Sequence, residues 1–332
     1  MENSSVDYGI MAGQRLMLGF DGVELNDELK HIIGDIHACG IILFSRNIES
    51  PEQVTALCAA CQDYAQACGL PPLFIAVDQE GGVVARLKPP FTMFRGNGFI
   101  NSAAEATTFA AITARELLQV GINMNFAPVL DIVPQGVDGI MQARVFKGDA
   151  QTVSLLGNQI IHTLQEKGVM AVAKHFPGIG RTVKDSHFHL PVLDIDLASL
   201  WQSDLIPFAD AKERGVAGIM LSHILYPQLD NKWQASLSPV VAGTLLRDQM
   251  GYDGLVMTDD LDMKAIDKDM ATCIQQILRC RIDMALICHK GPNIDKAFNE
   301  ILQRLKQDED LYLMGKKSLE RILRAKKKYV PV

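Results

Sequence analysis

Residues 151–175, QTVSLLGNQIIHTLQEKGVMAVAKH, contain the pattern that decides the fold. A helical pattern runs up to Gly168, and a continuous apolar run, VMAVA over residues 169–173, follows at once. Glycine just past a helix end supplies the left-handed cap, and an uninterrupted apolar run is typical of a strand buried on both faces of a parallel sheet. This segment therefore predicts a helix followed by a buried parallel strand.

The same alternation recurs along the chain. Further helical patterns end shortly before an apolar run, at Gly69, Gly121, Gly215 and Gly251. Helix starts are indicated at Ser50-Pro51, Ser102 and Ser238-Pro239. The runs that we predict to be strands cover residues 15–20, 40–44, 73–77, 122–129, 169–173, 217–222, 254–258 and 283–288.

Eight such units in 332 residues predict an α/β fold of the (β/α)8 TIM-type barrel class. We expect a single domain over residues 8–332, preceded by an N-terminal tail over residues 1–7. A doubly wound open sheet is the alternative. Its dinucleotide-binding form is disfavoured because no Gly-rich phosphate fingerprint follows the first run.

Composition and charge exclude several classes. Hydrophobic residues make up 48% and charged residues 21%, as in ordinary globular proteins, and the net charge of −7 argues against a nucleic-acid partner. No apolar run approaches the roughly 20 residues needed to cross a bilayer, and the N-terminus has no basic segment before an apolar stretch. We therefore expect a cytoplasmic protein with no membrane insertion, and no obligate protein partner is inferred.

Cys58 and Cys61 form a CxxC pair, which could indicate a metal or redox site. Both recur with Cys68 at helical spacing, so we favour three cysteines packed on one apolar helix face. The basic segment Lys316–Lys328 could bind an anionic partner. We favour a terminal helix that packs Leu319, Ile322 and Leu323 inward and keeps its lysines in water.

Polar side chains capable of catalysis follow the predicted strands. In barrels of this class the active site forms at the carboxyl ends of the strands. The residues at these positions are Asp78, Asp131, Lys174, His175, Ser222, His223, Asp259, Asp260 and His289. So many carboxylates and imidazoles exceed what helix capping requires, and we expect one mouth of the barrel to collect them.

The longest polar insertion, residues 176–189, has the sequence FPGIGRTVKDSHFH. Within it, Asp185 could orient the imidazole of His187 and stabilise its charged form for proton transfer. His187 and His189 could instead form a metal pair, completed by Asp185 and Asp259.

Lys174 could instead take part in a different reaction. A lysine at a strand end could form a Schiff base, as in barrel aldolases.

The blocks AGQRLMLGFDG, GIILFSRNIESPEQV, AVDQEGGVVARL, NFAPVLDI, KHFPGIGRTVKDSH, LSHILYP and GLVMTDDLDM follow one another in the order seen in family 3 glycoside hydrolases. More narrowly, the chain resembles the single-domain bacterial β-N-acetylglucosaminidases (β-hexosaminidases) of peptidoglycan recycling, from about residue 10 to about residue 300. The resemblance implies a retaining enzyme that releases terminal N-acetylglucosamine from β-linked, muropeptide-type substrates.

The resemblance also implies roles for single residues. Asp259 matches the nucleophile that forms a covalent glycosyl-enzyme, and His187, oriented by Asp185, matches the acid/base. The matches to sugar-binding residues are Asp78, Arg86, Arg144, Lys174 and His175. No metal or organic cofactor is implied, and the expected partner is a small carbohydrate substrate.

The chain departs from the family pattern at three positions. Ile179 replaces a histidine that is common in the KHFPG block, Val83 stands where many members have arginine, and Val145 stands where serine is usual. These departures affect loop support and the fit beyond the first sugar, and none removes a catalytic residue.

Several alternatives remain open from the sequence. They are β-glucosidase or xylosidase activity, the aldolase, a non-catalytic sugar-binding protein, a route in which the substrate's acetamido group is the nucleophile, and phosphate in place of water as acceptor.

Overall fold

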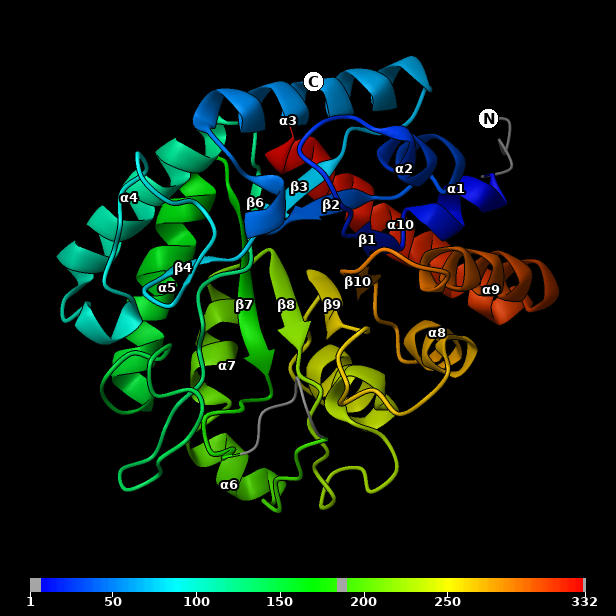
Figure 1. Cartoon of the computed structure of the whole chain (residues 1–332). Helices are drawn as coiled ribbons and strands as arrows, with labels where there is room; N and C mark the ends of the chain where they lie inside the picture. The colour runs from blue at the N-terminus through cyan, green and yellow to red at the C-terminus, as the bar shows by residue number, and fades with distance from the viewer. Residues whose placement is uncertain (1–6, 184–189, 331–332) are drawn as a thin grey trace.

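Eight parallel strands close into a barrel in the computed structural model, which describes residues 7–183 and 190–330 (Figure 1). The strands pair in the order β1-β2-β3-β6-β7-β8-β9-β10, and β10 returns to β1. Their bounds are β1 Leu16–Leu18, β2 Gly40–Leu43, β3 Phe74–Val77, β6 Met124–Asn125, β7 Met170–Phe176, β8 Gly218–Leu221, β9 Leu255–Asp260 and β10 Met284–Ile287. The predicted (β/α)8 class is confirmed, because each predicted run overlaps one barrel strand.

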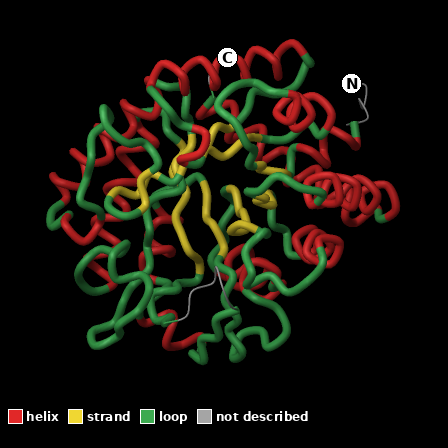
Figure 2. Tube along the Cα trace, viewed as in Figure 1, coloured by secondary structure: helices red, strands yellow, loops and turns green. Residues whose placement is uncertain are grey.

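Helices surround these strands (Figure 2). The α-helices are α1 Tyr8–Gly13, α2 Asp27–Lys30, α3 Pro51–Ala67, α4 Ala103–Gln119, α5 Ala150–Glu166, α6 Leu197–Gln202, α7 Ile206–Glu213, α8 Met270–Arg279, α9 Asn293–Gln307 and α10 Glu309–Tyr329. π-helical segments cover His31–Asp35 and Pro239–Gln249, and short 3-10 turns cover Ser45–Asn47, Asn97–Phe99 and Ala235–Leu237. None of the helices in the described part of the chain is long and apolar enough to cross a membrane.

The predicted helix boundaries are confirmed. Ser50 Oγ accepts the Gln53 N–H at 3.1 Å and Ser102 Oγ accepts the Glu105 N–H at 3.2 Å, which satisfies amide groups that the first helical turn leaves unpaired. The glycines predicted to end helices all have positive φ, at Gly69, Gly121, Gly168, Gly215 and Gly251.

Three strand predictions need correction. The run 122–129 forms only the two-residue strand β6, because Pro128 has no N–H to continue the ladder, although Val129 still bridges to Lys174. The runs 169–173 and 254–258 are too short, since β7 continues to Phe176 and β9 continues through Asp259 to Asp260.

The structure contains an antiparallel ribbon that the sequence analysis did not predict. It consists of β4 (Gln79–Gly81) and β5 (Val84–Ala85), which follow β3 directly. Gly81 and Gly82 make its turn with φ of 85° and 63°, and a Cβ at Gly82 would lie 2.9 Å from the Arg95 carbonyl. The ribbon folds the chain back so that Arg86 returns to Asp78.

One end of the barrel is covered by α10. Ile322 and Tyr329 join the cluster of apolar side chains that fills the barrel, together with Met17 and Phe74. The Lys326 ammonium lies 5.5 Å from the centre of the Phe74 ring. The barrel interior at this end is therefore filled by apolar side chains, whereas polar residues line a cavity at the strands' carboxyl termini.

The two packing predictions are correct only in part. Cys58 and Cys61 are buried free thiols, but Cys68 follows the last turn of α3 and is exposed. In α10, Leu319 and Ile322 are buried as predicted.

Two residues of α10 contradict the prediction. Leu323 is 39% exposed, and Lys326 is buried. The helix lies across the barrel end, so the face that it buries includes a lysine that spacing alone assigned to water.

Candidate active site

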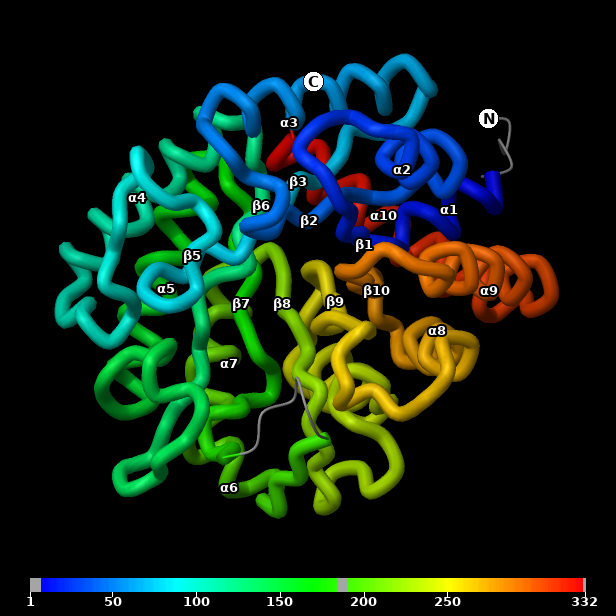
Figure 3. The backbone as a smooth tube through the Cα atoms, in the orientation of Figure 1, coloured from blue at the N-terminus to red at the C-terminus, as the bar shows by residue number. Residues whose placement is uncertain are grey.

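The open end of the barrel contains a cavity of about 600 Å3, a size typical of small-molecule sites. The strands surround one axis, so residues far apart in the sequence meet at this end (Figure 3). The polar residues that line the cavity are Arg46, Asp78, Arg86, Arg144, Lys174, His175, Asp259, Asp260, Asp262, Lys264 and His289. The predicted nucleophile Asp259 and all five predicted sugar-binding residues are among them, whereas Asp131, Ser222 and His223, which also follow predicted strands, do not line the cavity.

Asp78, which follows β3, lies between two cations. Lys174 Nζ lies 2.6 Å from Asp78 Oδ1, and Arg86 Nη2 lies 3.3 Å from Oδ2. Burial alone would raise the pKa of Asp78, but Lys174 and Arg86 hold it at about 2. The carboxylate is therefore ionised at neutral pH and presents a fixed acceptor to a ligand hydroxyl.

Glu80 in β4 continues this alternation of charge, and the sequence analysis missed it. Its Oε1 lies 2.7 Å from Lys174 Nζ and 2.7 Å from Arg144 Nη2, while Oε2 accepts from Arg144 Nε at 3.0 Å. Burial opposes ionisation of Glu80, but these cations lower its pKa below the ordinary value. Glu80 thus fixes both cations, and its place two residues after Asp78 on an unpredicted ribbon gave no signal in the sequence.

His175 is held by Asp131. Asp131 Oδ2 lies 2.7 Å from His175 Nδ1, and Asp131 Oδ1 accepts the backbone N–H of Ile179 at 2.8 Å. The other ring nitrogen, Nε2, lies 3.4 Å from Arg144 Nη2. An unbroken series of ion pairs and hydrogen bonds therefore runs from Arg86 to Asp131.

Asp259 stands near the end of β9, and its Oδ1 accepts the backbone N–H of Asp260 at 2.8 Å. Burial would raise the pKa of Asp259. The nearby imidazoles of His223 and His175, together with this hydrogen bond, lower it below the ordinary value. Asp259 is therefore an ionised carboxylate in a desolvated position, which is what a nucleophile for covalent catalysis requires.

His223, after β8, supports the backbone beside Asp259. Its Nε2 lies 2.8 Å from the Asp260 carbonyl oxygen and its Nδ1 lies 2.6 Å from Ser236 Oγ. Burial lowers the pKa of His223, and because a carbonyl oxygen can only accept, the ring donates from Nε2. The sequence placed His223 at a strand end, but its role as a support from below the cavity follows only from the structure.

The predicted acid/base pair cannot be placed. Asp185 and His187, and the alternative metal ligand His189, lie outside the described residues. The chain leading to them is held firmly: Arg181 donates two hydrogen bonds to the buried Asp204, from Nε at 3.0 Å and from Nη2 at 3.0 Å.

The three departures from the family pattern fall at different depths. Val83 is 68% exposed at the tip of the β4–β5 ribbon, and Val145 is buried. Ile179 lines the cavity with its side chain, while its backbone N–H binds Asp131. The hydrogen bond that positions His175 therefore does not depend on which side chain stands at position 179.

Comparison with known proteins agrees with this geometry. Residues 11–325 match the model of the glycosyl hydrolase family 3 N-terminal domain. A β-hexosaminidase of Thiobacillus denitrificans is 36% identical over 304 residues, covering 88% of this chain and 82% of its own. A β-hexosaminidase of Pseudomonas aeruginosa is 35% identical, covering 88% of this chain and 87% of its own.

Solved structures share the fold over nearly the whole chain. A family 3 β-N-acetylglucosaminidase from a Paenibacillus species superposes with a TM-score of 0.92 at 36% identity, and the match covers 97% of this chain but 62% of that one. A β-N-acetylhexosaminidase from Beutenbergia cavernae superposes with a TM-score of 0.90 at 27% identity, covering 98% of this chain and all of that one. This chain belongs to glycoside hydrolase family 3.

Proposed function

We propose that this protein is a retaining exo-β-N-acetylglucosaminidase. The observation that carries the proposal is an ionised, half-buried carboxylate, Asp259, in the same cavity as residues of the fixed series of charges from Arg86 to Asp131. The names of the relatives support the choice of an N-acetylated sugar.

We assign sugar binding to Asp78, Arg86, Arg144, Lys174 and His175. Charge-assisted hydrogen bonds are the strong ones, and here the charged groups already hold one another in place, so little ordering is needed when a sugar binds. Asp78 and Lys174 each offer a fixed charged group to a sugar hydroxyl.

In the first chemical step, Asp259 attacks the anomeric carbon while the bond from that carbon to the leaving oxygen breaks. His187 gives its proton to the leaving oxygen, and Asp185 orients the imidazole. In the second step, water attacks the anomeric carbon, His187 takes a proton from it, and Asp259 is released. An imidazole with an ordinary pKa near 6.5 can make both proton transfers near neutral pH.

The charges around Lys174 argue against the aldolase alternative. The side chain is only 3% exposed and lies between the carboxylates of Asp78 and Glu80, which raise its pKa although burial opposes them. A Schiff-base lysine must be deprotonated to attack a carbonyl. This environment stabilises the ammonium form instead.

A panel of nitrophenyl glycosides tests the proposal. We expect the N-acetyl-β-glucosaminide to have a higher kcat/KM than the β-glucoside and β-xyloside. Asp259→Asn should lower kcat by about 10³-fold or more, as loss of a nucleophile does. Asp248→Asn removes an exposed, ionised carboxylate and is the matched control. Similar activity in the two variants would contradict the assignment of Asp259.

The role of His187 has its own test. A good leaving group needs little protonation, so His187→Ala should lose much less activity on a dinitrophenyl glycoside than on a methylumbelliferyl or alkyl glycoside. An equal loss on all leaving groups would argue against a general acid at this position.

Product stereochemistry separates the remaining mechanisms. Retention at the anomeric carbon, with a 2-fluoro sugar trapped on the peptide containing Asp259, supports the covalent route. Retention without labelling would favour attack by the acetamido group, and inversion would exclude both. Sugar phosphate formed in phosphate buffer would identify phosphate as the acceptor.

We also propose that the substrates are muropeptide-type fragments and that residues 8–332 act as one catalytic domain in the cytoplasm. Free cysteines support a reducing compartment, because thiols persist there. Release of N-acetylglucosamine from purified muropeptide fragments by the full chain, and its location after cell fractionation, test these points.

A further inference from the structure

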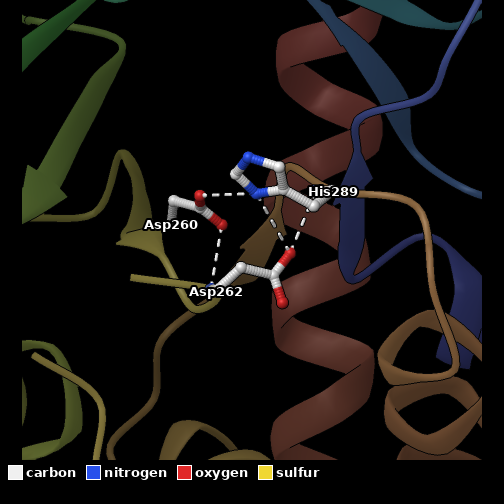
Figure 4. A group of neighbouring side chains, drawn as sticks. All are labelled: Asp260, Asp262 and His289. Atoms are coloured by element: carbon white, nitrogen blue, oxygen red, sulfur yellow. Dashed lines mark hydrogen bonds and ion pairs between the residues drawn. The ribbon is translucent and has the colours of Figure 1, made fainter. Parts of the chain in front are cut away.

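A second group of polar side chains stands at the rim of the cavity (Figure 4). Asp260 ends β9, Asp262 follows two residues later, and His289 comes shortly after β10. His289 Nδ1 lies 3.5 Å from Asp260 Oδ2 and 3.6 Å from Asp262 Oδ2. One donor atom from each residue lies within 4.8 Å of the other two.

These separations fit one small cation. Zinc binds histidine nitrogen and carboxylate oxygen at about 2.0–2.2 Å, and two such ligands at a tetrahedral angle are roughly 3.4 Å apart. The distances of 3.5 and 3.6 Å from His289 Nδ1 to the two carboxylate oxygens are close to that value.

The carboxylates are already oriented by their surroundings. Asp260 Oδ1 accepts the backbone N–H groups of Asp262 and Cys288, both at 3.0 Å, and this leaves Oδ2 facing His289. Asp262 Oδ1 accepts from Asn293 Nδ2 at 2.9 Å, and Oδ2 accepts the backbone N–H of His289 at 3.0 Å. Such outer hydrogen bonds are what hold metal ligands in place.

Asp260 is largely buried and lies beside other carboxylates. The residue is only 9% exposed, and its Oδ2 lies 3.5 Å from His289 Nδ1. Asp259 adds a further negative charge beside it. A cation bound here would offset the cost of burying neighbouring carboxylates.

We propose that Asp260, Asp262 and His289 bind a divalent first-row transition-metal ion, with Zn²⁺ as the best fit. One imidazole among the ligands favours Zn²⁺ over Mg²⁺ or Ca²⁺, which prefer oxygen alone. The three residues line the cavity, so the remaining coordination positions face it. The site does not depend on the glycosidase activity.

The chain offers a matched control on its surface. His31 also contacts two carboxylates, but Nδ1 lies 2.9 Å from Asp35 and Nε2 lies 3.0 Å from Asp295. The two ring nitrogens point in different directions, so these carboxylates cannot share an ion with one nitrogen. His31→Asn therefore removes a histidine between two aspartates without touching the proposed site.

Titration of EDTA-treated full-length protein with ZnCl2, followed by calorimetry, tests the proposal. We expect one Zn²⁺ per chain, bound about tenfold or more weakly in Asp262→Asn and in His289→Asn. His31→Asn and His187→Ala should bind as the unaltered protein does, and a hundredfold excess of Ca²⁺ should not displace the ion.

Three outcomes would overturn the proposal. The first is that the unaltered protein binds no Zn²⁺. The second is that Asp262→Asn and His289→Asn bind Zn²⁺ as tightly as the unaltered protein does. The third is that binding is lost in His187→Ala alone. The last would place the ion on the alternative site that includes His187. Because the measurement is binding, none of these outcomes bears on whether Asp259 is the nucleophile.

Discussion

Glu80 offers the sharpest test of how the site is held together. The change Glu80→Gln keeps the size of the side chain and removes its charge. In the unaltered protein Glu80 contacts Lys174 and Arg144 through three distances of 2.7, 2.7 and 3.0 Å, and its side chain is 1% exposed. The amide nitrogen of glutamine would face one of these cations and donate where an acceptor is required.

The expected loss of stability in Glu80→Gln follows from the burial of this side chain. Breaking a buried ion pair by removing one partner costs about 3–5 kcal/mol, because a buried charge is left uncompensated. The entropy of unfolding is about 2.1 cal/mol/K per residue, so a chain of this length should lose about 4–7 °C in Tm. We also expect KM to rise more than kcat falls, since Lys174 and Arg144 are assigned to sugar binding.

Differential scanning calorimetry and steady-state kinetics measure both effects. Glu116→Gln is the matched control: that side chain is 13% exposed and accepts hydrogen bonds from Thr92, at 3.0 Å from N and 2.6 Å from Oγ1, and its one recorded cation is the exposed Arg115 at 3.8 Å. The free energy of unfolding should fall by about 1 kcal/mol in this control variant. If Glu80→Gln destabilised the protein no more than this control and left KM unchanged, the idea that Glu80 fixes the two cations would be wrong.

Three further predictions concern charge and stability. The pKa of Asp78 is about 2 against an ordinary 3.8, so its ion pairs contribute on the order of 2 kcal/mol to the free energy of unfolding above about pH 4, and this contribution is lost as pH falls towards 2. Urea unfolding across pH 2–6 should show the loss in the unaltered protein and not in Asp78→Asn. Burial lowers the pKa of Lys326 from 10.5 to about 8, so the unfolded chain holds more protons than the folded chain between these pH values. The free energy of unfolding should therefore rise by about 3 kcal/mol from pH 8 to pH 10.5. Lys326→Met should abolish this rise. Arg181→Met leaves the buried Asp204 unpaired and should cost about 3–5 kcal/mol in chemical denaturation, whereas an unchanged midpoint would show that the pair contributes little.

Several parts of the site were predictable because they depend on residues near one another in the chain. The positive φ at Gly168 and the apolar run after it define one βα unit, and repetition of that unit predicts the barrel. Once a barrel is expected, residues at strand ends such as Asp78 and Asp259 must meet at one mouth, because parallel strands all end on the same side.

Other parts depend on neighbours that the sequence keeps far apart. Lys174 and Asp78 are 96 positions apart, and Arg144 and Glu80 are 64 apart. No local pattern distinguishes Glu80 from a surface glutamate, and none distinguishes Lys326 from the lysines around it. Their burial is decided by the short ribbon and by the helix that closes the barrel end.

The sequence by itself determined the order of strands and helices, the barrel and the group of residues at its mouth, because helix caps, apolar runs and strand ends are local features. Only the tertiary structure decided which charge faces which: that Glu80 holds Lys174 and Arg144, that Asp131 holds His175, and that His223 supports the backbone beside Asp259. The reason is electrostatic. The strength and the direction of each interaction depend on distances across strands and on exclusion of water, and both exist only once the barrel has closed.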